Sequence, residues 1–258
     1  MSPLESHSPA VIPLLLTSSV VAHDIAVKLK DTEARLHHVL ESITQWLRIN
    51  PRQPIVLCDG SNFDFRPIVQ DAYPDAQIES LFFENDQQKV REFGRGYGEG
   101  EIVKYATQHS KLIQQAGCFA KCTSKLWVEN FEACKKHWNG QLLLSGVFLN
   151  VFSPLQPTVL QQIDTRFYFA SLSMYERYFM NAHLTMDSRA GHGLEDSFFD
   201  TLVRENISHC LLPTPPVISG VGGGTGAYYR NTFKRTLKER LRLYLVRHDR
   251  KFARLFSA

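Results

Sequence analysis

The first third of the chain alternates strands and helices, and this alternation constrains the fold more than any other feature of the sequence. Short apolar runs at 12–21, 54–58 and 78–83 have the composition of buried strands. Helical periodicity separates them, first after Asp31 and again over 65–72. Strands joined in this way by helices predict a parallel sheet with right-handed crossovers.

Polar residues stand at the ends of the first two predicted strands. Thr17 and Ser18 end the first strand, and Asp59-Gly60-Ser61 follows the second. Ligands of parallel sheets bind at the carboxyl ends of the strands. The position alone therefore marks these residues, and the segment after the third strand, as candidate ligand contacts.

A glycine-rich segment at 94–101 is predicted to be a loop that runs into a helix. Glycines there can bring backbone N–H groups close to an anion at the helix start. The spacing is not a dinucleotide fingerprint, because the third glycine is misplaced and polar residues, not a strand, precede the segment. Glu99 and Glu101 would repel phosphate, so either they bind hydroxyl groups or they only stabilise the first helical turn.

Further strands are expected at 118–128, 147–152 and 163–169. In the last of these, Asp164 and Arg166 point to the same face of the strand among apolar neighbours. Burying both charges is costly unless they pair or meet a ligand. A structural salt bridge and a role in a binding site are both open interpretations.

Two segments in the last third of the chain are predicted to be loops. Residues 191–202 form a loop that leads into a short helix of acidic and aromatic residues. Residues 218–226 form a glycine loop without the Gly-Lys-Ser/Thr ending of a nucleotide P-loop, which argues against an ATPase. This second loop either covers a substrate or is a plain mobile connector.

Charge is distributed unevenly along the 258 residues. Residues 230–258 hold ten Lys and Arg against two acids, which leaves 19 basic and 24 acidic residues in 1–229. Apolar residues recur at helical spacing in this tail, so a basic amphipathic helix either lies on an anionic membrane surface or packs its apolar side on the body. We divide the chain into a body at 11–229 and a basic C-terminal helical segment at 230–258.

Several classes of protein are disfavoured by the sequence. Five scattered cysteines favour reduced thiols in a cytosolic chain, and no apolar run is long enough for a spanning helix. The histidines and cysteines offer no metal-ligand set, and there is no Gly-x-Ser-x-Gly elbow of a serine hydrolase. Nucleic-acid binding is not expected, because the body is acidic and a recognition motif is absent.

An ordered set of short motifs resembles small bacterial glycosyltransferases of cell-surface polysaccharide assembly. The resemblance spans roughly residues 11–230, and the order of the pieces carries most of it. The pieces are Thr17-Ser18-Ser19, Asp31-Thr32-x-x-Arg35-Leu36, Trp46, Asp59-Gly60-Ser61, Ile78-Glu79, Gly96-Tyr97-Gly98-Glu99-Gly100-Glu101, Lys121-x-Thr123, Trp127-Val128-x-Asn130-Phe131, Asp164-Thr165-Arg166-Phe167, Leu194-Glu195 and Ser219-Gly220.

The resemblance implies a GT-A-like, Rossmann-type α/β fold with a mostly parallel sheet flanked by helices. It implies a nucleotide-sugar donor and a saccharide or lipid-linked saccharide acceptor, in capsule, O-antigen or lipopolysaccharide assembly. We expect a cytoplasmic protein that attaches peripherally to the inner face of the cytoplasmic membrane through residues 230–258. A nucleotidyltransferase or methyltransferase on a doubly wound sheet, and a non-catalytic membrane-associated binding protein, are the alternatives.

The resemblance also implies where the donor binds. The nucleoside pocket would be lined by Thr17, Ser18 and Asp59. The ribose, diphosphate or sugar would lie against Gly96, Gly98, Glu99 and Glu101. The acceptor loop would contain Ser219, Gly220, Gly223 and Thr225.

Most folds of this kind hold a divalent ion with an Asp-x-Asp motif, where this chain carries Lys121-Cys122-Thr123-Ser124-Lys125. A departing nucleoside diphosphate gains negative charge, which a metal ion or fixed cations can stabilise. We therefore predict no firm metal or other cofactor, although a divalent metal stays possible, and transfer that persists in excess chelator. Lys121, Thr123, Lys125 and Arg166 are the predicted diphosphate contacts.

For an inverting transfer a carboxylate must take the proton from the acceptor hydroxyl. The late Leu194-Glu195 element of the resemblance places Glu195 in this role. Asp196 and Asp164 are the second candidates.

Overall fold

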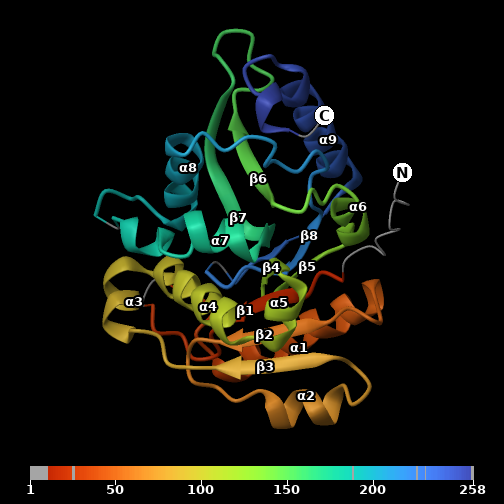
Figure 1. Cartoon of the computed structure of the whole chain (residues 1–258), viewed down its shortest axis with the longest axis vertical. Coiled ribbons are helices and arrows are strands. Elements are labelled where there is room, and N and C mark those ends of the chain that lie inside the picture. The colour runs from red at the N-terminus through yellow and green to blue at the C-terminus, as the bar shows by residue number, and fades with distance from the viewer. Residues whose placement is uncertain (1–10, 25–26, 188, 225, 230, 257–258) are drawn as a thin grey trace, which may run out of the picture.

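The computed structural model describes residues 11–24, 27–187, 189–224, 226–229 and 231–256. Within them a six-stranded sheet is flanked by helices (Figure 1). Four neighbouring strands of the sheet are parallel and the last two are antiparallel to their neighbours, which confirms the predicted α/β fold with a mostly parallel sheet. In spatial order the strands are β3 (Ile78–Phe82), β2 (Ile55–Asp59), β1 (Leu14–Ser18), β4 (Cys118–Thr123), β7 (Val159–Ser171) and β6 (Leu142–Leu149).

The central strand β1 is buried on both faces of the sheet. Leu15 enters one hydrophobic core together with residues of helix α4 (Arg95–His109). Leu14 and Leu16 point the other way and pack with residues of helix α1 (Thr32–Ile49). Two covered faces explain why the strand is a continuous apolar run and does not alternate with polar residues.

Helix α1 forms where the sequence predicts it. It begins after Asp31, whose carboxylate accepts a hydrogen bond from the Ala34 backbone N–H, and it ends before Pro51. Its Trp46 is fully buried, and the indole N–H donates to the carbonyl of Leu126 (3.0 Å). This bond ties the helix to the chain that follows β4.

The glycine segment at 94–101 is part of helix α4 and not a loop before it, so that prediction was wrong. Glycine inside a helix costs about 1 kcal/mol relative to alanine. Here a Cβ on Gly98 would lie 2.7 Å from the amide of Asn85, and one on Gly100 would overlap the side chain of His183. The glycines therefore let α4 approach its neighbours closely.

The stretch 118–128 holds two strands where one was predicted. After β4 the chain turns at Ser124 and Lys125, and β5 (Leu126–Val128) joins a separate three-stranded sheet with β8 (Ile218–Val221) and β9 (Tyr228–Tyr229). The strand β8 takes up the first part of the glycine loop predicted at 218–226. The glycines that follow β8 lie outside the strand, with Gly223 and Gly224 in a turn.

The hairpin of β6 and β7 runs through the upper half of the molecule in Figure 1, with α8 (Leu194–Arg204) on one side of it and α9 (Phe233–His248) on the other. Both strands begin before the predicted ranges, at Leu142 and Val159. Helix α8 follows a loop, as predicted, and packs against β7. The other helical elements are α2 (Arg66–Ala72), α3 (Gln87–Phe93), α5 (Lys111–Ala116), α6 (Phe131–Lys135), α7 (Leu172–Tyr178), η1 (Ala182–Thr185) and η2 (Ala253–Leu255).

The basic helix predicted at the C-terminus is α9 (Phe233–His248). Val246 of the helix is buried, and the chain then folds back so that Phe252, Leu255 and Phe256 enter the core of the body. The C-terminal segment is thus anchored on the body through its last residues. In the part of the chain that the structure describes, no helix has the length and apolar character needed to cross a bilayer.

Candidate functional site

A cavity of about 190 Å³ lies at the carboxyl ends of β1 and β4, and we call it the first cavity. Its walls include the end of β1 and the segment after it, Arg35 of α1, the turn after β4, the first half of α4, the middle of β7, the start of α8 and the turn after β8. The predicted site residues that line it are Thr17, Ser18, Gly98, Glu99, Thr123, Lys125, Arg166, Glu195 and Gly223. The rule that ligands bind at strand ends therefore located this cavity correctly.

Two hydroxyl groups in the wall of the first cavity have no hydrogen-bond partner among the described residues. They are Thr17 Oγ1 and Ser18 Oγ, whose residues are 4% and 1% exposed. A buried polar group without a partner destabilises a fold by about 1–3 kcal/mol, so such groups in a cavity point to a ligand that pairs with them. The ends of β1 therefore offer unused hydrogen-bonding capacity.

Lys125 lines the first cavity as a buried cation without a partner. Its residue is 4% exposed, and its ammonium makes no hydrogen bond or ion pair with the described residues. Burial, together with the charge of the nearby Arg35 guanidinium, lowers the pKa of Lys125 to about 7. A Cβ on Gly223 would lie 2.9 Å from Lys125 Cε, so the turn after β8 lies directly against this side chain.

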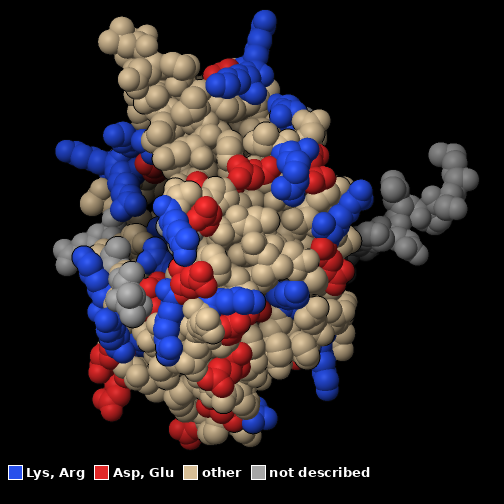
Figure 2. Space-filling model, turned by 90° about the vertical axis from the view of Figure 1, so that its left-hand side faces the viewer, with Lys and Arg blue, Asp and Glu red and all other residues tan. Residues whose placement is uncertain are grey.

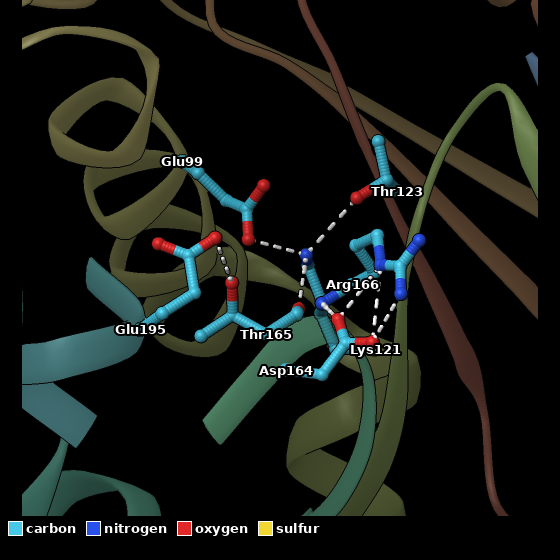
Figure 3. A network of polar contacts seen from close by, with 7 residues as sticks. All are labelled: Glu99, Lys121, Thr123, Asp164, Thr165, Arg166 and Glu195. Carbon is cyan, nitrogen blue, oxygen red and sulfur yellow. Dashed lines mark hydrogen bonds and ion pairs between the residues drawn. The ribbon is translucent and has the colours of Figure 1, made fainter. Parts of the chain in front are cut away.

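Lys121, four residues earlier, is fully paired (Figure 3). Its ammonium donates to Glu99 Oε1 at 2.5 Å, to the Thr165 carbonyl at 2.8 Å and to Thr123 Oγ1 at 3.3 Å. The side chain is completely buried and does not line the cavity. Lys121 therefore holds Glu99 in place at the cavity wall and presents no free charge of its own.

Asp164 and Arg166 form an ion pair on one face of β7. The guanidinium donates from Nε to both carboxylate oxygens (2.8 and 3.1 Å) and from Nη2 to Oδ2 (2.5 Å). This pairing raises the pKa of Arg166. Arg166 also lines the first cavity and stacks on Tyr229, with its Cζ 5.1 Å from the ring centroid. The two interpretations of this pair are thus compatible: it is a salt bridge, and it stands in the wall of a site.

Glu195 lies in the first turn of α8, and its side chain lines the first cavity. Thr165 Oγ1 donates to it at 3.4 Å (Figure 3). Burial raises the pKa of Glu195, and the negative charges of Glu99 and Asp164 add to this effect. The carboxylate is therefore a stronger base than an exposed glutamate.

Asp196, the neighbour of Glu195, stabilises the start of a helix. Its carboxylate accepts the backbone N–H of Gly193 at 2.9 Å and caps the start of α8. The residue does not line the first cavity. The structure thus separates two adjacent acids into one that faces the cavity and one that stabilises a helix terminus.

The carboxylates of Asp59 and Glu101 also accept hydrogen bonds from the backbone. The Asp59 carboxylate has no exposed surface and accepts hydrogen bonds from the backbone N–H groups of Val20 (2.9 Å) and Ser61 (2.7 Å). Glu101 accepts the backbone N–H of Asp86 (3.1 Å), just before α3. Neither residue lines the first cavity, and nor does Gly96.

Of the four residues predicted for an acceptor loop, Ser219 and Gly220 lie in β8. Ser219 Oγ donates to Glu129 Oε1 at 2.5 Å, and Gly220 adopts φ +106°, close against the carbonyl of Lys125. Only Gly223 lines the first cavity, and Thr225 lies outside the described residues.

Sequence reasoning missed several residues of the first cavity, among them Arg95 and Asn85. Arg95 stands in the glycine segment at 94–101, whose glycines and acids were the predicted ligand contacts. In the structure it lines the cavity, and a Cβ on Gly224 would overlap its guanidinium. Asn85 follows β3, so the strand-end rule that located Thr17 could have found it.

A candidate metal site is found elsewhere, on α1. Among the described residues, three potential ligands lie together only at His37, His38 and Glu41, and none of them lines the first cavity. His38 Nδ1 contacts Glu41 Oε2 at 3.0 Å, and the hydroxyl of Tyr228 donates to both oxygens of Glu41 (2.9 Å each). Protein partners already occupy the carboxylate, so this cluster carries no argument for a metal.

No protein-family model and no curated protein matches the sequence. Solved structures are distantly similar. The inositol-1-phosphate CTP transferase from T. maritima is 11% identical, with 94% of this chain and 99% of that chain covered and a TM-score of 0.45. Mouse xyloside xylosyltransferase 1 is 12% identical (78% and 83% covered, TM-score 0.42). The glycosyltransferase GlyE of Streptococcus pneumoniae TIGR4 is 7% identical (72% and 42% covered, TM-score 0.45). Likenesses this weak say nothing about the reaction, which has to be argued from the site.

Proposed function

We propose that the protein is a glycosyltransferase that moves a sugar from a nucleotide-sugar donor to a saccharide acceptor, with the donor in the first cavity. The observation that carries the proposal is the unpaired ammonium of Lys125 beside the unpaired hydroxyls of Thr17 and Ser18. A cation without a counter-ion fits a phosphate, and neighbouring hydroxyls fit a nucleoside. These groups meet where open α/β sheets bind their ligands.

The donor diphosphate would lie between Lys125 and Arg95, under the turn at Gly223 and Gly224. Both glycines contact these cations so closely that a larger residue would displace them. Arg35 adds a buried positive charge, because among the described residues its guanidinium donates to the carbonyls of Ser19 and Leu29 and to no carboxylate. Fixed cations of this kind stabilise the charge that develops on a departing nucleoside diphosphate.

Lys121 and Arg166 would shape the donor site without binding the diphosphate directly. Each already carries an ion pair, with Glu99 and Asp164 respectively. Among the described residues the first cavity also holds no group of three metal ligands. We therefore expect transfer to persist in excess chelator; activity that EDTA abolishes and Mn²⁺ restores would contradict this part of the proposal.

Glu195 would act as the base that takes the proton from the acceptor hydroxyl. It lines the first cavity together with Thr165 and Arg166 of the neighbouring strand β7. Its raised pKa makes the carboxylate a better proton acceptor. Asp196 is held by Gly193, so it is the weaker candidate.

A thermal-shift screen tests the donor part of the proposal. UDP, GDP, CMP, ADP, dTDP and their sugars are each added with and without chelator. Saturation at about 100 times the dissociation constant stabilises by roughly 2.7 kcal/mol, a melting shift of roughly 5–10 °C for a chain of this size. One nucleotide class should give this shift in EDTA, and its sugar should be released slowly to water. Absence of a shift with every compound would contradict the proposal.

Nucleoside triphosphates, added to the same screen, separate a glycosyltransferase from a nucleotidyltransferase. A nucleotidyltransferase would respond to a nucleoside triphosphate and release pyrophosphate when a sugar phosphate is added. A glycosyltransferase releases a nucleoside diphosphate or monophosphate from the sugar nucleotide. Mass analysis of the products therefore distinguishes the two readings directly.

We further propose that α9 holds the enzyme on an anionic membrane, where a lipid-linked acceptor would be found. Five apolar residues of α9 recur at helical spacing and are 41–83% exposed: Phe233, Leu237, Leu241, Tyr244 and Leu245. Lys and Arg fill most of the other positions. By contrast, the face of the molecule that carries α3 and α8 shows positive and negative side chains interspersed (Figure 2). An exposed apolar stripe within a basic helix suits the interface of anionic lipids.

The tip of the β6–β7 hairpin extends this surface. Phe152 and Leu155 at the tip are 45% and 92% exposed, and the side chains of Lys238 and Arg242 lie over the Phe152 ring at 5.8 and 5.7 Å. Removal of residues 230–258 would uncover the core, so a paired substitution is the sharper test. The double variant Leu237→Glu, Leu241→Glu should lose flotation with phosphatidylglycerol vesicles, while neutral vesicles should not bind the wild type. Unchanged flotation of the folded variant would contradict the proposal.

A further inference from the structure

A second cavity, of about 370 Å³, lies between the β6–β7 hairpin and the inner face of α9. Its volume falls within the range of about 300–1,000 Å³ that is usual for small-molecule sites. The hairpin contributes Ser145 and Asp164, and α9 contributes Arg235, Thr236 and Glu239. Of the short motifs that carry the resemblance in the sequence, only Asp164-Thr165-Arg166-Phe167 contributes residues to this cavity, namely Asp164 and Arg166.

The two cavities share a wall. Arg166 and Tyr229 line both of them, and the guanidinium is held over the Tyr229 ring while Asp164 binds it from the side of the second cavity. A molecule in the second cavity would therefore lie next to a sugar in the first. A transfer reaction between two substrates needs this proximity.

The charged groups of the second cavity are mostly paired with each other. Asp164 binds Arg166, and Glu239 accepts from Arg242 Nη1 at 2.7 and 2.8 Å. Only Arg235 lines the cavity without a described partner. The second cavity thus lacks the buried, unpaired cation that marks the first, and it suits a ligand with little charge.

Hydrogen-bonding groups without partners stand among apolar side chains in this cavity. Ser145 Oγ has no hydrogen-bond partner among the described residues. Asn231 donates from Nδ2 to the carbonyl of Ile218 and to Ser219 Oγ, and its Oδ1 accepts no hydrogen bond from the described residues. Tyr229, in the shared wall, offers an aromatic ring. Rings that pack on the apolar faces of a sugar, with amide and hydroxyl groups that pair with its hydroxyls, are the chemistry of a saccharide site.

We propose that the second cavity is the acceptor site and binds the terminal sugar of a neutral saccharide. The inference rests on the proposed glycosyl transfer and goes beyond it, because it assigns the second substrate to named residues. The helix α9 bounds the cavity with Arg235 and Thr236 while its opposite side carries the exposed apolar stripe. A saccharide on a lipid carrier would thus reach the cavity beside the surface that meets the membrane.

The test fills the second cavity and leaves the first unchanged. Thr236→Trp places an indole in the cavity. Val203→Trp adds the same bulk at an exposed position of α8 that lines neither cavity, and it is the matched control. Arg235→Ala removes one side chain that lines the cavity. Because Arg235 is exposed, this variant should fold normally, and it tests the inference even if Thr236→Trp disturbs the fold. The probes are the octyl glycosides of glucose, galactose, mannose, rhamnose and N-acetylglucosamine, at concentrations below micelle formation.

Four quantities are measured in the three variants and the wild type. Donor affinity and the rate of donor hydrolysis report on the first cavity, and glycoside binding by saturation-transfer NMR and the glycoside KM for transfer report on the second. We expect Thr236→Trp to raise the glycoside KM at least 10-fold with donor affinity and hydrolysis unchanged. Arg235→Ala should raise the glycoside KM several-fold, and Val203→Trp should change none of these quantities. Equal glycoside binding in Thr236→Trp and wild type would overturn the inference. So would a wild type that binds none of the glycosides. A wild type that binds no nucleotide-sugar donor would instead count against the proposed function.

Discussion

The two cavities meet at Arg166 and Tyr229 and yet treat charge in opposite ways. The first cavity keeps Lys125 buried and unpaired beside two unpaired hydroxyls, whereas the acids and most of the bases of the second cavity pair with one another. An unpaired buried charge is destabilising and persists where a ligand supplies its counter-ion. This difference is why we propose an anionic ligand for the first cavity and a polar, uncharged one for the second.

The largest expected effect comes from the carboxylate beside the shared wall. Glu195→Gln keeps the shape of the side chain and removes the base, so transfer should fall by about 10²–10⁴-fold. Donor affinity should stay within a factor of about three, because the amide replaces a group that does not bind the diphosphate. Asp196→Asn is the matched control. It should lower the melting temperature, because Asp196 caps α8, and leave the turnover nearly unchanged. Turnover that Glu195→Gln leaves unchanged would remove this residue from catalysis.

A pair of lysine variants sharpens the contrast between paired and unpaired charge. Lys121→Met leaves Glu99 without its counter-ion and should destabilise the fold by about 3–5 kcal/mol, measured by denaturant unfolding. Lys125→Met removes a cation that has no partner, so the fold should be unchanged or more stable. The same variant should weaken nucleotide-sugar binding by roughly 10- to 100-fold. Equal destabilisation by the two variants would show that Lys125 is a structural residue.

The glycine turn gives a smaller effect on the same cavity. In Gly223→Ala the new methyl group meets Lys125 Cε at 2.9 Å and displaces the ammonium. Donor affinity should fall several-fold, and calorimetry should show no further loss when Gly223→Ala is added to Lys125→Ala. Additive losses in this double-mutant cycle would mean that the turn acts on the donor independently of the lysine.

A pair of opposite pH dependences tests the environment of Lys125. The pKa of Lys125 is about 7 in the fold and 10.5 in the ordinary side chain. Between these values the unfolded chain binds the proton and the folded chain does not, so the free energy of unfolding should rise with pH relative to Lys125→Met. Affinity for a nucleotide-sugar should fall over the same window as the ammonium is lost. A flat difference between wild type and variant from pH 6 to pH 10 would contradict the assigned environment of Lys125.

The parallel half of the fold could be predicted from the sequence because its signals are local. Asp31 caps a helix, Pro51 follows its end, and the strands before Asp59 and after Pro13 are apolar runs that helices cover on both sides. Thr17 and Ser18 followed from the general rule for strand ends. These predictions needed no knowledge of which distant segments meet.

The rest of the site depends on contacts between distant segments. Lys121 and Lys125 look alike in the sequence, and only the approach of Glu99 to one of them and of Gly223 to the other makes them different. Asp59 follows a strand and resembles a ligand residue, but its carboxylate is taken up by loop N–H groups. The second cavity is formed by elements about 90 residues apart, so no motif could reveal it.

The central claim is that protein cations, with Lys125 foremost, hold the diphosphate of a sugar nucleotide. Its most direct test is a calorimetric titration of wild type and Lys125→Met with the nucleotide-sugar from the screen, in buffer with EDTA at pH 6.5. The account expects stoichiometric binding to the wild type and a 10- to 100-fold weaker association with the variant. Binding that requires Mn²⁺, or an equal affinity of the two proteins, would contradict it.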